Sequence, residues 1–113
     1  MARVAIARQM VSDAGLVPIY SPANPDGHSV KNSGGKLLLY VRNCGEKDVV
    51  VTIRTGYTVS GLKLEDRCIE VPAGGERFIG PLNPQVYNRP DSSEVWLDYS
   101  ETEYVEIAAL LIP

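Results

Sequence analysis

The sequence predicts an all-β protein: a single antiparallel β-sandwich of Ig-like or jelly-roll-like type with an extended N-terminal arm. Three observations carry this prediction. Apolar and polar residues alternate along several short runs, which is the period of a strand with one buried face. Clusters of Gly, Pro and Asn separate these runs, as turns do in sandwiches. The chain has 113 residues, which is the size of one domain.

The first 34 residues differ from the rest of the chain. Val4–Val11 predicts a strand, with a frayed helical turn as the alternative. The stretch Leu16–Gly35 contains three prolines and three glycines, too many for a regular element. Leu16–Tyr20 is nevertheless too apolar for a free tail. We therefore expect residues 1–34 to form an arm, packed on the body or on a neighbour, and residues 35–113 to form the sandwich body.

Two β-rich runs follow the arm. Lys36–Arg42 and Asp48–Arg54 are joined by the short Asn/Gly loop Asn43–Lys47, which predicts a hairpin. On this interpretation the alternating apolar residues of the two strands share one buried face. These residues are Leu37, Leu39, Val41, Val49, Val51 and Ile53.

The rest of the body alternates turns and strands. Gly56–Gly61 predicts a loop or a short edge strand, and Gln85–Asn88, bracketed by prolines, predicts an edge or bulged crossing. The final strand is apolar on both faces, which indicates burial inside the fold or against a neighbouring subunit. The other strands expected are Arg67–Val71, Glu76–Ile79, Glu94–Tyr99 and, last, Tyr104–Ile112.

Composition argues against several classes of partner. The net charge is −3 and the basic residues are scattered, whereas nucleic-acid binding needs a concentrated basic face. No apolar run approaches the ~20 residues of a spanning helix, so we expect no membrane partner. No signal peptide is recognisable, which predicts synthesis and solubility in a cytoplasm. Cys44 and Cys68 are expected to be free, partly buried thiols, although a bridge between them stays open.

Catalytic and metal-binding patterns are absent from the sequence. His28 is the only histidine, and no nucleophile or orienting acid is placed beside it, which predicts a solvated or capping side chain. The acidic residues between Asp91 and Glu103 fit no calcium-loop spacing, and no Cys/His spacing fits zinc. We expect no enzyme activity, no metal and no cofactor.

Large aromatic residues on the face away from the core are the most informative surface feature. Alternation places Tyr40 and Trp96 there. Such residues form either a second apolar layer covered by the arm or a subunit interface, where Tyr and Trp are enriched; glycan stacking is a third interpretation. The candidate interface residues are Val17, Ile19, Tyr20, Tyr87, Trp96, Leu110 and Ile112.

Several stretches together carry a family resemblance. They are Asp26-Gly27-His28, Lys36–Asn43, Gly61-Leu62, Asp66-Arg67, Val71–Pro81, Val86-Tyr87-Asn88, Val95–Ser100 and the closing apolar strand. With these motifs the chain resembles a family of small tailed-bacteriophage and prophage proteins encoded among virion morphogenesis genes. The motifs are turn and strand signatures, and the family has no catalytic residues to transfer.

The resemblance implies a virion structural protein. Its most plausible role is a capsid decoration (cement) protein on the outer capsid surface, made in the bacterial host cytoplasm, with the major capsid protein lattice as partner. Self-association into a homo-oligomer suits this role, because a repeating lattice is bound through area and multivalency. The alternatives are a minor head–tail or tail component and a glycan-binding β-sandwich module.

Overall fold

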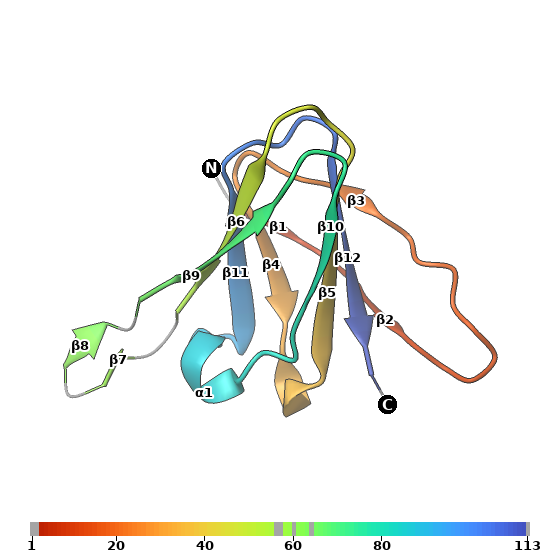
Figure 1. Cartoon of the computed structure of the whole chain (residues 1–113). Coiled ribbons are helices and arrows are strands. Elements are labelled where there is room, and N and C mark those ends of the chain that lie inside the picture. The colour runs from red at the N-terminus through yellow and green to blue at the C-terminus, as the bar shows by residue number, and fades with distance from the viewer. Residues whose placement is uncertain (1–2, 56–57, 60, 64, 113) are drawn as a thin grey trace.

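Two β-sheets lie face to face and enclose one apolar core in the computed structural model, which describes residues 3–55, 58–59, 61–63 and 65–112 (Figure 1). Sheet A contains, in spatial order, β1 (Val4–Ala5), β4 (His28–Lys31), β11 (Glu94–Tyr99), β6 (Val49–Arg54) and β9 (Arg67–Val71). Sheet B contains β10 (Glu76–Ile79), β5 (Leu37–Asn43), β12 (Val105–Leu111) and β2 (Arg8–Met10), with β3 (Ser21–Pro22) also paired to β12. The all-β sandwich is confirmed.

The remaining elements are short. The strands β7 (Thr58–Val59) and β8 (Leu62–Lys63) pair with each other apart from the two sheets. Within the expected loop or edge strand 56–61, Gly56, Tyr57 and Ser60 lie outside the described residues. A 3-10 turn, η1 (Ser33–Gly35), precedes β5, and the helix α1 (Pro84–Tyr87) occupies the segment expected to be an edge crossing. No helix in the described part of the chain is long and apolar enough to cross a membrane.

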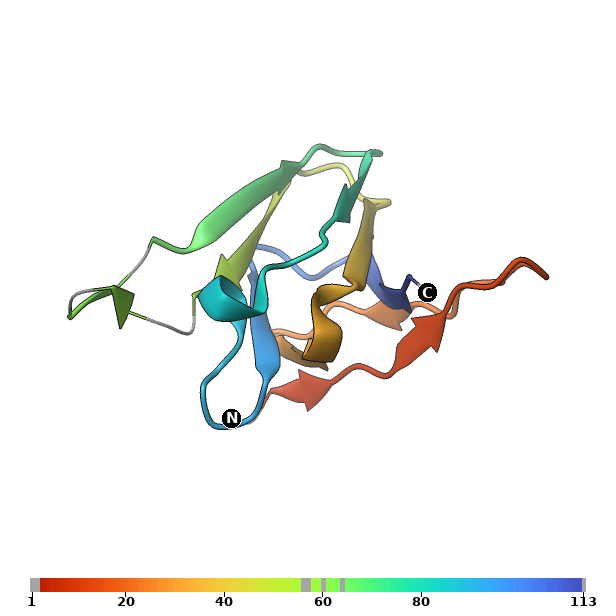
Figure 2. The same ribbon diagram turned by 90° about the horizontal axis from the view of Figure 1, so that it is seen from below.

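Both sheets are mixed, which corrects the expectation of a purely antiparallel sandwich. β1 runs parallel to β4, and β2 runs parallel to β12. The reason is that the N-terminal segment passes along one edge of sheet A and then continues along one edge of sheet B (Figure 2). All other pairs of strands within the two sheets are antiparallel among the described residues.

The faces expected to be buried are buried, but the expected hairpin is wrong. β5 belongs to sheet B and β6 to sheet A, so Asn43–Lys47 crosses between the sheets. Alternation specifies which face of a strand is apolar, and an apolar face can be covered by the opposite sheet as well as by an adjacent strand. Asn43 stabilises this crossing: its buried amide nitrogen donates to the carbonyl oxygens of Lys47 (2.6 Å) and Val71 (3.1 Å).

The first 34 residues are not a separate arm, which corrects the expected boundary at residue 35. His28–Lys31 forms β4, an interior strand of sheet A that lies between β1 and β11. Its Val30 belongs to the core. Of the first 34 residues, the segment between β2 and β3, residues 11–20, projects from the body, and we call it the β2–β3 loop (Figures 1 and 2). Prolines and glycines interrupt this region, yet the short extended runs β1, β2 and β3 still pair at sheet edges.

The last strand is buried on both faces, as the sequence predicts. Ile107 and Ala109 point into the core, while Ala108 and Leu110 lie on the outer face of sheet B and are also buried. Ala108 stands directly opposite Tyr40 of β5 in the register. Other parts of the same chain therefore bury the outer face of β12.

Candidate interaction surface

A row of aromatic side chains covers the outer face of sheet B. The rings of Tyr40 and Phe78 stack with their centroids 4.5 Å apart, and Tyr20 lies 5.9 Å from Tyr40 on its other side. The Arg42 guanidinium lies 3.8 Å from the centre of the Tyr20 ring. We call Tyr20, Tyr40, Arg42 and Phe78 the aromatic face. Aromatic residues and arginine are enriched in the centres of protein interfaces.

The sequence around Phe78 explains why an aromatic ring points outward. Phe78 and Ile79 are adjacent apolar residues in one strand, so only one of them can face the core. The structure buries Ile79, opposite Leu39, and leaves Phe78 63% exposed. Sequence reasoning did not select Phe78, although this adjacency was a usable signal.

Charged groups border the aromatic face. The Tyr40 hydroxyl donates a hydrogen bond to the Glu76 carboxylate, and this bond, with a smaller effect of burial, raises the pKa of Tyr40 to about 12. Arg42 pairs with Glu106 at 3.0 Å on the neighbouring strand β12. The Tyr40 hydroxyl therefore stays protonated at physiological pH.

The β2–β3 loop extends the apolar surface beyond the sheet edge. The Gln9 side chain holds the loop by two 2.8 Å hydrogen bonds, donating to the Ile19 carbonyl oxygen and accepting from the Ile19 N–H. Val17 and Ile19 are nevertheless 87% and 75% exposed. Exposed side chains of this size at the end of a tethered loop suit contact with another molecule better than contact with water.

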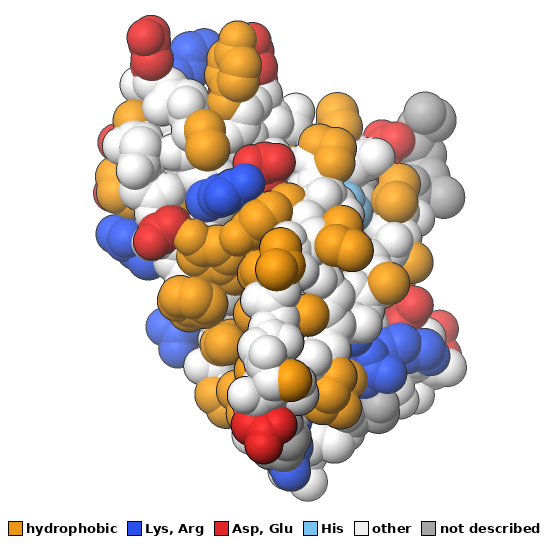
Figure 3. Space-filling view, turned by 90° about the vertical axis from the view of Figure 1, so that its right-hand side faces the viewer, with side chains coloured by type: hydrophobic (Ala, Val, Ile, Leu, Met, Phe, Trp, Pro, Cys, Tyr) orange, Lys and Arg blue, Asp and Glu red, His pale blue; other side chains and the backbone are white. Residues whose placement is uncertain are grey.

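The seven predicted interface residues do not lie together. Val17, Ile19 and Tyr20 lie on the β2–β3 loop. Leu110, which is buried, and Ile112, which is exposed, lie at the end of the neighbouring strand β12. Figure 3 shows hydrophobic side chains gathered in a band on this side of the molecule. The two others are elsewhere: Tyr87 is in α1, packed against the core, and Trp96 is on sheet A.

Trp96 is covered by cations. The guanidinium groups of Arg3 and Arg89 lie 4.7 and 4.1 Å from the centre of its ring. Arg3 also forms an ion pair with Asp98 (2.6 Å). Residue 27 is a glycine, and a Cβ at this position would collide with the Arg3 guanidinium and with the Asp98 carboxylate. The N-terminal segment therefore covers Trp96, which favours the covered-layer interpretation over an interface or a sugar-stacking platform.

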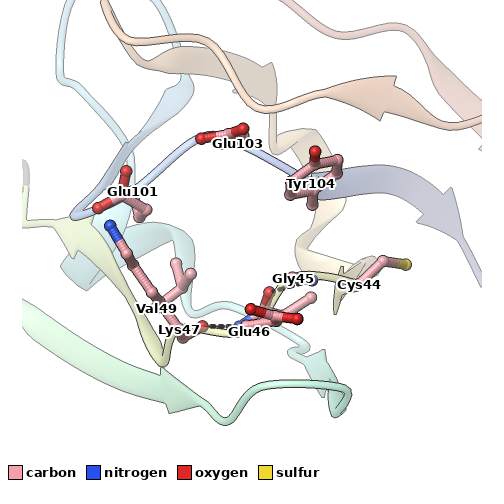
Figure 4. Close-up of a pocket in the computed structure, with 9 residues that line it drawn as sticks. Cys44, Gly45, Glu46, Lys47, Val49, Glu101, Glu103 and Tyr104 are labelled. Atoms are coloured by element: carbon pink, nitrogen blue, oxygen red, sulfur yellow. Dashed lines mark hydrogen bonds between the residues drawn. The ribbon is translucent and has the colours of Figure 1, made fainter.

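A hollow of about 440 Å³ lies between the loop after β5 and the loop before β12. Figure 4 shows Glu46, Lys47, Glu101 and Glu103 around its rim, while the sulfur of Cys44 points away from its centre. Lys47 comes from the loop after β5 and extends toward Glu101 in the loop before β12, so the rim carries charges of both signs.

His28 is buried, which corrects the expectation of a solvated or capping side chain. It is only 2% exposed, and its Nδ1 lies 2.7 Å from the Tyr99 hydroxyl oxygen. Burial lowers the pKa of His28 and raises the pKa of Tyr99. The pair acts as a neutral hydrogen bond between β4 and β11.

We expect His28 to make the fold less stable as the pH falls. The folded protein binds a proton at His28 more weakly than the unfolded chain, whose histidine pKa is about 6.5. The stabilisation is therefore complete above that pH and is lost as the pH falls below it. Urea unfolding from neutral to mildly acidic pH measures this slope, and His28→Gln should flatten it. An equal slope in both proteins would contradict the prediction.

Both cysteines are free and exposed, so they are not partly buried as expected, and the open alternative of a bridge is not realised. No cluster of three His, Cys, Asp or Glu side chains suited to a metal ion exists among the residues that the structure describes.

Comparison with protein-family models, with curated proteins and with solved structures found no match. The molecule is an all-β sandwich of two mixed sheets, with an aromatic outer face and a projecting apolar loop.

Proposed function

We propose that the protein is a bacteriophage virion structural protein: a capsid decoration (cement) protein whose aromatic face binds the lattice of the major capsid protein. The aromatic face carries the proposal, because the ring of Phe78 is 63% exposed and stacks on the half-buried ring of Tyr40. The sequence motifs resemble those of virion morphogenesis proteins, which supports the proposed location of this protein on a phage head.

The shape of this surface suits a lattice partner better than a small ligand. It is carried by the strands β5 and β10 of one sheet and by Tyr20 just before β3, and Glu106 of β12 borders it through its ion pair with Arg42. An interface with an aromatic centre and a polar rim is the usual anatomy of protein–protein contacts. Many copies on a repeating surface convert a modest affinity per copy into stable coverage.

The test adds the purified protein to heads of the encoding phage that were assembled without it. Imaging should show density repeated over the icosahedral lattice of the outer surface. Density at a single vertex would indicate a head–tail or tail component instead. Absence of binding to heads together with binding to purified polysaccharide would favour the glycan-binding alternative.

We expect Phe78→Ser to weaken binding to heads at least tenfold. Truncating an exposed aromatic anchor at the centre of an interface typically costs about 2 kcal/mol or more. Leu62→Ser is the matched control, since Leu62 is 73% exposed on the separate β7–β8 pair. Binding isotherms on heads measure both variants, and equal affinities would exclude the aromatic face as the contact. Removing residues 1–34 is less informative, because it would delete β4.

A further inference from the structure

The sandwich is open along one side. β9 is the last strand of sheet A and β10 is the last strand of sheet B, and both lie on the side where the turn Pro72–Gly75 joins them. Each has one edge with no ladder partner among the described residues. Free edges of this kind can pair with an added extended segment.

A groove of about 310 Å³ lies between these two edge strands. Its apolar lining comes from the two sheets and from the segment after β10: Ile53, Ile69, Phe78, Ile79, Pro81, Leu82 and Tyr87. We call these seven residues the seam groove. Its volume falls at the lower end of the range for ligand-binding pockets.

One arginine lines the groove. Arg67 of β9 pairs in register with Ile53, so it is in line with a core-facing position. It forms no ion pair with the described residues. The groove therefore fits an extended apolar segment that also carries a carboxylate.

The β2–β3 loop is such a segment. It carries the exposed side chains of Val17 and Ile19 and, a few residues earlier, the exposed carboxylate of Asp13. It projects beside β2 and β12, at the opposite side of the molecule from β9 and β10 (Figures 1 and 2). A loop in this position cannot reach the groove of its own chain.

The geometry points to a head-to-tail contact between copies, in which the β2–β3 loop of one copy, centred on Val17–Ile19, occupies the seam groove of the next. The negative charge of Asp13 complements Arg67 at the groove. Loop and groove are different surfaces, so the contact is heterologous and can close a ring or continue along a lattice. Phe78 lines the groove and also belongs to the aromatic face, but the contact joins copies to each other and is measured without capsids.

Cross-linking two single-cysteine proteins tests this contact. Both carry Cys44→Ser and Cys68→Ser; one adds Val17→Cys and the other Ile69→Cys. With a short bismaleimide, the mixture should give a heterodimer at least fivefold above the level given by Val17→Cys mixed with a Leu62→Cys control. A yield equal to the control, or predominant Val17→Cys homodimers, would overturn the proposal.

A second cysteine position in the seam groove distinguishes absence of the contact from a folding defect in the first variant. Ile69 is half-buried, whereas Phe78 is exposed and lines the same groove. Phe78→Cys in place of Ile69→Cys should give the same heterodimer, and thermal melts show that each variant is folded. Failure of both groove cysteines to exceed the control would overturn the contact, even if the protein decorates heads.

Discussion

Val51→Asp is expected to leave the chain unfolded at room temperature. Val51 is 0% exposed at the centre of β6, where it pairs with Tyr99 on one side and Ile69 on the other. An ionised carboxyl group without a partner in such a site costs several kcal/mol. Domains of this size are stable by about 5–15 kcal/mol in total, so this cost removes most of the free energy of unfolding. Circular dichroism and urea titration measure the loss.

The neighbouring residue provides the matched control. Val50 is on the outer face of the same strand and lies directly opposite Glu70 in the register. Val50→Lys places a charge beside an opposite charge at the surface, and should change stability by about 0.5 kcal/mol or less. A soluble Val51→Asp variant that melts cooperatively near the wild-type temperature would contradict the assignment of this face to the core.

Asn88→Ala should cost about 2–3 kcal/mol, the second-largest effect. Asn32 and Asn88 form a buried pair: Asn32 Nδ2 donates to Asn88 Oδ1 (2.7 Å), and Asn88 Nδ2 donates to the Asn32 carbonyl oxygen (3.0 Å). Removing Asn88 leaves two buried polar groups without these partners, and each costs about 1–3 kcal/mol. Asn32 Nδ2 would keep only its bond to the Leu82 carbonyl oxygen (3.1 Å).

A double-mutant cycle distinguishes this pair from general loss of packing. Asn32→Ala combined with Asn88→Ala should cost less than the sum of the single changes, since either single change already removes the hydrogen bond between the two side chains. The control is Asn83→Ala: Asn83 is exposed and accepts a hydrogen bond from the Gln85 N–H at the start of α1 (2.9 Å), so its loss should cost about 1 kcal/mol or less. Strict additivity in urea unfolding would contradict the coupling.

The asparagine pair also connects the core to the seam groove. It joins the end of β4 to the segment between β10 and β11, which supplies Leu82 and Tyr87 to the groove. We therefore expect variants of this pair to weaken the contact between copies as well as the fold. Sequence reasoning named Asn88 only within a family motif and did not find the pair, because a buried amide pair has no local signature.

The candidate surface was only partly predictable. Val17, Ile19 and Tyr20 were selected because apolar residues in a Pro-rich segment are unusual, and they lie on the projecting loop. Trp96 was selected because it faces away from the core, and that orientation is correct. Its covering by Arg3 and Arg89 joins residues far apart in the chain, so no local pattern could reveal it.

The sequence by itself determined the class of fold and the buried face of each main strand, because a two-residue period is a local property of the backbone. Leu39, Val51 and Leu97 are all buried as alternation requires. Tertiary structure alone decided which strands are neighbours, that β5 and β6 lie in different sheets and that β1 and β2 pair in parallel. An apolar face is equally well covered by many partners, and only the packing of the whole chain selects among them.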